Sequence, residues 1–161
     1  MAENMAGKGM ASEGVSGGYA PGKGMPDVGM ASEGTQGKYI PGVCNIGKKE
    51  TRKRYAMAVI GLVVTLAFAL AVDSLAWPKL YLLFAFIPLF LTSEGFYQGY
   101  FHFCAGFAAR KIFDFSGSGG GRGDVADEEA HRQDMEKAKM IHKYSIATSI
   151  IITAIIYLIF K

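Results

Sequence analysis

Three long apolar runs constrain the fold of this chain more than any other feature of its sequence. Residues 55–72 and 144–160 contain no charged side chain, and residues 80–109 contain only Glu94. A helix of about 20 apolar residues crosses the roughly 30 Å hydrocarbon core of a bilayer. Soluble helices seldom lack a polar face over such a length. We therefore predict an all-α integral membrane protein with three transmembrane helices.

The second run is longer than one membrane crossing requires. Pro88 falls inside it, where the missing N–H group and the ring of proline predict a kink in the helix. We expect a tilted span followed by a helical extension along the membrane surface, which ends near Arg110.

Basic residues flank the three runs unequally. One set precedes the first run and another lies between the second and third runs: Lys48, Lys49, Arg52, Lys53 and Arg54, then Arg110, Lys111, Lys137, Lys139 and Lys143. The connection between the first and second runs offers only Lys79. Because Lys and Arg accumulate in cytoplasmic loops, we expect a multi-pass protein of the cell (inner) membrane. Its N-terminus is expected in the cytoplasm and its C-terminus outside.

The chain divides by composition into four parts. Residues 1–47 form a glycine-rich cytoplasmic tail, and residues 48–113 form a two-span hairpin. Residues 114–123 contain Ser-Gly-Ser-Gly-Gly-Gly-Arg-Gly and are expected to be a flexible linker. Residues 124–161 predict an amphipathic helix that begins with Asp124 as its N-cap and continues directly into the third span.

The tail contains a duplicated peptide. Residues 9–22 read GMASEGVSGGYAPG, and residues 29–42 read GMASEGTQGKYIPG. The plainest interpretation is an open, flexible tail, because glycine at this density favours turns and loose chain. The alternative is that both copies contact a partner, with Tyr19 and Tyr39 in equivalent places, since two linked weak contacts raise the effective concentration. That alternative predicts that residues 1–43 are ordered only when a partner is present.

Polar residues and glycines share the second run. Glu94, Gln98 and His102 recur every four residues, which places them along one side of a helix. Polar groups at membrane depth usually face protein, and Gly95 and Gly99 form a GxxxG motif that allows close helix packing. We expect Glu94, Gln98 and the two glycines to contact another helix, from this chain or from a different subunit. A ligand-binding or proton-handling role is the alternative.

The two cysteines suggest a further possibility. Cys104 lies two residues after His102, and Cys44 precedes the first span. Thiols in the cytoplasm stay reduced, so a metal or redox site made of Cys44, Cys104 and His102 is chemically allowed. The plainer interpretation is that both cysteines are inert packing residues. His102 also lies among aromatic residues, which would allow it to bind a tetrapyrrole, although the sequence requires no cofactor.

Two short motifs give a partial resemblance. Cys44-Asn45-Ile46-Gly47 precedes a basic run and a glycine-containing span, and Gly95-Phe96-Tyr97-Gln98 is followed by Cys104. Over residues 44–110 this order resembles small multi-pass bacterial membrane proteins of unknown function. The resemblance implies a small multi-pass membrane protein and supplies no activity.

These features together predict a non-catalytic accessory or structural subunit of a larger membrane complex. It would contact the lipid bilayer and other membrane protein subunits, the latter through its tail and second span. No nucleophile–base arrangement indicates an enzyme, and a net charge of +3 does not indicate nucleic acid. The alternatives are a small redox or metal-handling membrane protein, and a subunit that supports a pigment, haem or quinone in electron transfer.

Overall fold

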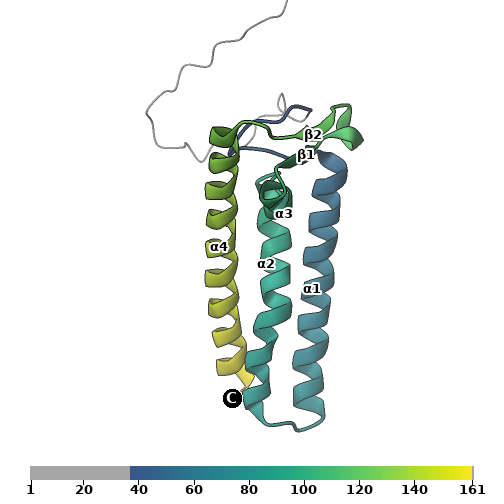
Figure 1. Ribbon diagram of the computed structural model, residues 1–161. Helices are drawn as coiled ribbons and strands as arrows, with labels where there is room; N and C mark the ends of the chain where they lie inside the picture. The colour runs from purple at the N-terminus through teal and green to yellow at the C-terminus, as the bar shows by residue number, and fades with distance from the viewer. Residues whose placement is uncertain (1–36, 161) are drawn as a thin grey trace, which may run out of the picture.

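Three long helices lie side by side in the computed structural model, which describes residues 37–160 (Figure 1). They are α1 (Lys48–Ser74), α2 (Phe86–Tyr100) and α4 (Glu128–Phe160). A 3₁₀ helix, η2 (Lys79–Ala85), leads directly into α2. Three helical segments, with η2 and α2 counted as one, are long and apolar enough to cross a membrane. This confirms the expected helical fold and its three helices of membrane-spanning length.

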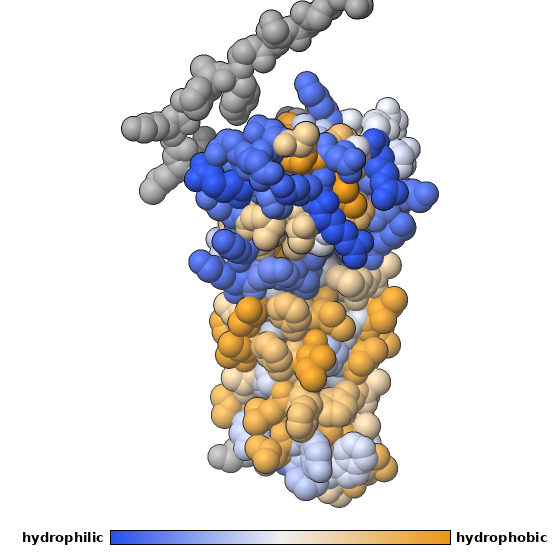
Figure 2. Space-filling model, in the orientation of Figure 1, coloured by the Kyte–Doolittle hydropathy of each residue, from blue (hydrophilic) through white to orange (hydrophobic). Residues whose placement is uncertain are grey.

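The outer surface of the bundle is apolar over most of its length. Large aliphatic side chains such as Ile60, Leu70, Ile87 and Ile151 point outward and are more than half exposed. Hydrophobic residues cover the lower part of the visible face, whereas hydrophilic residues gather at the end where α1 and α4 begin (Figure 2). Apolar surface of this extent is unfavourable in water and suits a lipid environment.

A small folded unit covers the hydrophilic end of the bundle (Figure 1). We call residues 39–47 and 101–127 the cap. Its elements are α3 (Ala105–Ala109), β1 (Ile112–Asp114), η3 (Ser116–Ser118) and β2 (Arg122–Asp124). The two strands pair in antiparallel fashion, so Ile112 lies opposite Asp124 and Asp114 lies opposite Arg122.

The segment that the sequence predicts as a linker, residues 114–123, therefore forms most of a hairpin. The N–H of Phe115 donates to the carbonyl of Gly121 at 2.9 Å, and Gly119 turns the chain with a φ of +81°. The side chain of Phe115 is buried, which anchors the loop to the cap. Glycine-rich composition alone does not reveal this anchor.

The amphipathic helix begins later than predicted. Asp124 is the last residue of β2, and the N–H of Val125 extends the pairing by donating to the carbonyl of Lys111 at 2.7 Å. The chain is thus held extended until Asp127, whose Oδ1 accepts a hydrogen bond from the N–H of Glu129 at 3.0 Å. From Glu128 the helix continues without a break to its end, as the sequence predicts.

The second apolar run is less regular than expected. Pro88 lies in the first turn of α2, where its missing N–H group is tolerated. The residues before α2 form the 3₁₀ helix η2, so Pro88 lies near the start of an α-helix and not in the middle of a kinked one. At the other end α2 stops at Tyr100, and His102 adopts a left-handed φ of +51°. The predicted surface extension is therefore a sharp turn followed by the five-residue helix α3.

Candidate functional site

The Cys-Asn-Ile-Gly segment meets the turn that contains His102 and Cys104. Asn45 is fully buried, and its Nδ2 donates to the carbonyl of Cys104 at 3.0 Å while its Oδ1 accepts from the N–H of Cys104 at 2.7 Å. The backbone N–H groups of Asn45 and Ile46 both lie 3.3 Å from the carbonyl of His102. Gly47 leaves no room for a side chain, because an added Cβ would lie 3.1 Å from the Cα of Phe115. The Cys-Asn-Ile-Gly segment therefore closes the cap against the end of α2.

Both cysteines are buried free thiols. The Cys44 Sγ donates to the carbonyl of Lys38 at 3.4 Å, and burial raises the pKa of this thiol. Within residues 37–160, no three side chains of the His, Cys, Asp or Glu types lie close enough together to hold a metal ion. The predicted set of Cys44, Cys104 and His102 is thus not assembled as a ligand group in the part of the chain that the structure describes.

The glycine motif of the second span packs within the chain. A Cβ at Gly95 would lie 2.7 Å from the carbonyl oxygen of Arg54, and one at Gly99 would lie 2.9 Å from the Tyr55 ring. Gly61 on α1 faces α2 in the same manner, because an added Cβ there would lie 2.9 Å from the carbonyl oxygen of Pro88. The helix that this motif accepts is α1, so Gly95 and Gly99 do not offer an open surface to another subunit.

A buried carboxylate lies between α2 and α4. Gln98 Nε2 donates to Glu94 Oε1 at 2.7 Å, and His142 Nδ1 lies 3.0 Å from the same oxygen. Glu94 and Gln98 are 6% and 5% exposed, whereas about half of the His142 side chain is open. Among the described residues, Glu94 Oε2 and Gln98 Oε1 have no hydrogen-bond partner. Glu94 and Gln98 can therefore each accept a hydrogen bond from a further donor.

Hydroxyl groups continue this polar contact along the two helices. Ser149 donates to the carbonyl of Ser145 at 2.6 Å and lies 3.3 Å from the Ser93 hydroxyl. The hydroxyls of Tyr97 and Thr148 are 2.9 Å apart. Small residues of this kind allow close helix packing in a membrane. Sequence reasoning missed this feature, although the four-residue spacing of Ser145 and Ser149 would have shown it.

The predicted polar stripe needs one correction. Glu94 and Gln98 lie on the same side of α2 as expected, but His102 follows the end of the helix and belongs to the turn. The imidazole beside Glu94 comes instead from His142 on α4. A stripe drawn from helical periodicity fails here because the helix ends at Tyr100.

Residues 39–42, at the end of the second copy of the tail peptide, pack against β1 and α4. The Tyr39 hydroxyl donates to Asp134 Oδ2 at 2.9 Å, and the N–H of Gly42 donates to Asp134 Oδ1 at 2.7 Å. The Tyr39 ring stacks on Phe113 with centroids 4.9 Å apart. We call the surface formed by Phe113, Gln133 and Asp134 the Asp134 groove. Tyr39 and Gly42 thus contact their own chain. Most of the segment 1–43, which the sequence suggests is ordered only with a partner, lies outside the described residues.

Burial shapes the chemistry of this groove. Asp134 has no exposed surface, and burial raises the pKa of its carboxyl group despite the two hydrogen bonds that it accepts. The pKa of the Tyr39 phenol is also raised, chiefly by burial and then by its hydrogen bond to Asp134. Burial thus shifts the ionisation of both groups toward their neutral forms. Tyr19, the equivalent residue of the first copy, lies outside the described residues.

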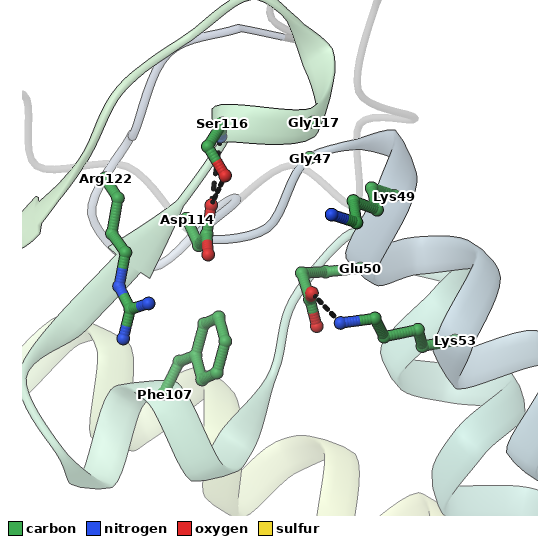
Figure 3. A pocket seen from close by; sticks show the side chains of 9 residues that line it. All are labelled: Gly47, Lys49, Glu50, Lys53, Phe107, Asp114, Ser116, Gly117 and Arg122. Atoms are coloured by element: carbon green, nitrogen blue, oxygen red, sulfur yellow. Dashed lines mark hydrogen bonds and ion pairs between the residues drawn. The ribbon is translucent and has the colours of Figure 1, made fainter.

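A hydrophilic pocket of about 450 Å³ opens where the hairpin meets the first turns of α1 (Figure 3). Its lining is drawn from α1, α3 and the hairpin: Gly47, Lys49, Glu50, Lys53, Phe107, Asp114, Ser116, Gly117 and Arg122. Lys53 pairs with Glu50 at 2.5 Å. Ser116 donates to Asp114 from its hydroxyl and its N–H, and this lowers the pKa of the carboxyl group. The pocket presents charges of both signs beside the apolar part of α1.

Comparison with known protein families, curated proteins and solved structures finds no match to this chain.

Proposed function

We propose that this protein is a non-catalytic accessory subunit of a membrane complex. Three helices would anchor it in the cell membrane, and the cap and tail would bind other membrane proteins in the cytoplasm. The observation that carries the proposal is the docking of Tyr39 and Gly42 onto Asp134. It supports the view that Tyr-x-Pro-Gly acts as a docking peptide in this chain.

Because the peptide is duplicated, one copy remains after residues 39–42 have bound to Asp134. Tyr19-Ala20-Pro21-Gly22 carries the same Tyr, Pro and Gly at the same positions as residues 39–42. The structure describes one acceptor of this kind, and residues 39–42 fill it. The other copy can then serve a different polypeptide, and a tethered ligand needs only modest affinity for that purpose.

The charge distribution supports the proposed orientation. The N-terminus of α1 and the residues before the apolar part of α4 lie at the same end of the bundle (Figure 1). Both segments are rich in Lys and Arg, whereas among the described residues the opposite end offers Lys79. The positive-inside bias therefore favours a cytoplasmic cap. Reporter fusions after residues 76, 123 and 161 test this, since only the fusion after residue 123 should be active in the cytoplasm.

The proposed contacts with partners lie in the tail and cap instead of the second span. Gly95, Gly99, Glu94 and Gln98 all contact helices of their own chain. Their expected role in binding a separate subunit therefore loses its support. The described part of the tail supports this placement of the contacts, because Tyr39 and Gly42 contact Asp134.

Extraction in a mild detergent followed by sizing tests the proposal. We expect the wild-type chain to migrate with companion proteins in fixed ratio and Tyr19→Ala to lose at least one of them. Val15→Ala is the matched control, because position 15 differs between the two copies. A wild-type chain that runs alone, as a monomer in its micelle, would contradict the proposed function.

A further inference from the structure

We infer that the Asp134 groove is a peptide-binding site for the sequence Tyr-x-Pro-Gly, with residues 39–42 as its resident ligand and residues 19–22 as a competing one. This inference rests on the proposed function, because it identifies the surface that recognises the docking peptide. In this view residues 19–22 and residues 39–42 compete for the same groove. The peptide that is not bound in the groove is then free to bind a partner.

Each constant residue of the peptide has its own contact in the groove. The tyrosine supplies a hydroxyl for one oxygen of Asp134 and a ring for the face of Phe113. The glycine supplies an N–H for the other oxygen. Its φ is +67°, and an added Cβ would lie 3.3 Å from the Cβ of Gln133, so larger residues are disfavoured.

The proline sets the shape of the ligand. The N–H of Val43 donates to the carbonyl of Ile40 at 3.1 Å, which closes a four-residue turn with Pro41 and Gly42 at its centre. Proline followed by a glycine with positive φ is the pattern of a type II turn. The first copy has Pro21 and Gly22 in these places, so its sequence favours the same turn.

The residues that differ between the two copies indicate which copy binds the groove more tightly. Ile40, which is partly buried, corresponds to Ala20 in the first copy. The hydrogen bonds that join Ile40 to Cys44 come from the backbone, so they do not depend on side-chain identity. The second copy is also tied closely to the cap through Asn45. We therefore expect residues 39–42 to hold the groove and residues 19–22 to bind it more weakly.

The first copy can reach the groove. Gly22 and Tyr39 are separated by 17 positions in a glycine-containing segment. A chain of that length spans at most about 60 Å when fully extended. This span allows residues 19–22 to compete within one chain, and a ligand tethered at that range has a high effective concentration.

Peptide binding to an emptied groove tests the inference. The full chain carrying Tyr19→Ala and Tyr39→Ala is placed in detergent micelles and titrated with fluorescent peptides of residues 9–22 or 29–42. Fluorescence anisotropy should show saturable binding of both peptides, with residues 29–42 binding more tightly. A 9–22 peptide with Tyr19→Ala should bind about tenfold or more weakly, because it loses a hydrogen bond to a carboxyl group and an aromatic contact.

Variants of the chain locate the site of binding. Adding Asp134→Ala to the emptied chain should weaken both peptides by about tenfold or more. Glu136→Ala is the matched control, since Glu136 is an exposed acid on the same helix, and it should leave binding unchanged. Circular dichroism verifies that each variant keeps its helical content. If the double variant does not fold, the titration uses Tyr39→Phe, which keeps the stacked ring but loses the hydrogen bond.

Two results would overturn the inference. One is the absence of saturable binding to a folded chain with an emptied groove, and the other is binding that Asp134→Ala leaves unchanged. If companion proteins are still present in the wild-type preparation, either result would contradict peptide binding at the groove but would not contradict the proposed function. Peptide binding in a chain that purifies without companions would instead support the groove and contradict the proposed function.

Discussion

The side chain of Asn45 pairs with the backbone of Cys104 through two hydrogen bonds, one donated and one accepted. This pairing resembles the contact between neighbouring strands, but a single side chain provides it. It joins the residue that precedes α1 by three positions to the turn between α2 and α3. The two ends of the first helical hairpin are thus fastened together inside the cap.

Removing this side chain should destabilise the cap. Asn45→Ala leaves the buried N–H of Cys104 without its partner, whereas the carbonyl of Cys104 keeps the N–H groups of Phe107 and Ala108. One unsatisfied buried donor costs about 1–3 kcal/mol, so we expect the free energy of unfolding to fall by that amount, measured by thermal or denaturant unfolding in micelles. Lys139→Ala, at an exposed position of α4, is the control and should change little. Equal stabilities of the two variants would refute a structural role for Asn45.

A methyl group at the α1–α2 contact should separate the helices. In Gly95→Ala the new Cβ would lie 2.8 Å from the backbone nitrogen of Ala58, and backbone atoms cannot move aside cheaply. We expect a loss of about 1–3 kcal/mol in unfolding free energy. Gly106→Ala is the matched control, because its Cβ would meet only the Cys104 Sγ at 3.7 Å. That variant should be neutral or slightly stabilising, and the prediction fails if the two behave alike.

The Glu94–His142 contact should appear as an energetic coupling. A double-mutant cycle with Glu94→Ala and His142→Ala measures it, because each replacement removes the contact between the two side chains, while Gln98 still donates to Glu94 when only His142 is replaced. We expect a coupling of about 1–2 kcal/mol, since Glu94 is almost fully buried. The exposed pair Glu129 and Arg132 provides the comparison, and its coupling should be smaller because water screens both charges. A Glu94–His142 coupling no larger than that of the exposed pair would contradict the assignment.

Asp134 should make the stability of the folded chain depend on pH in a direction that can be predicted. Burial raises the pKa of its carboxyl group above 3.8 in the folded chain, so folding favours the protonated form. Its contribution to stability is present below pH 3.8 and is lost as the pH rises through the folded-state pKa. Asp134→Asn keeps a neutral group of the same shape. Relative to wild type, this variant should therefore become more stable as the pH rises from about 4 to about 7.

The matched comparison for this titration is Asp114→Asn. Hydrogen bonds from Ser116 lower the pKa of Asp114, so any stability that this carboxylate contributes is present above pH 3.8 and is lost as the pH falls. The two variants should depart from wild type in opposite directions along the pH axis. Unfolding curves collected across the same series of buffers would show this, and parallel responses would contradict the assigned role of burial at Asp134.

The long helices could be predicted from the sequence, because their apolar residues form long continuous runs. The lengths of the apolar runs, and the continuity of residues 128–160 without glycine or proline, follow from the fact that a helix satisfies its own backbone. The close packing at Gly95 and Gly99 could also be foreseen, although the identity of the contacting helix could not.

The cap could not be predicted because its contacts are distant in sequence. Asn45 and Cys104 are 59 positions apart, and Tyr39 and Asp134 are 95 apart. No local periodicity connects such residues. The hairpin was missed for a related reason, since a glycine-rich segment gains its order from Phe115, which lies buried within the cap. His102 was placed on the helical stripe because nothing in the apolar pattern marks Tyr100 as the last residue of α2.

The 33-residue helix α4 carries both Asp134 and the hydroxyl-bearing contacts with α2. Asp134 and Ser149 are about 22 Å apart along its axis, with no glycine or proline hinge between them. One continuous helix therefore links the contact at Asp134 to the polar contacts inside the bundle.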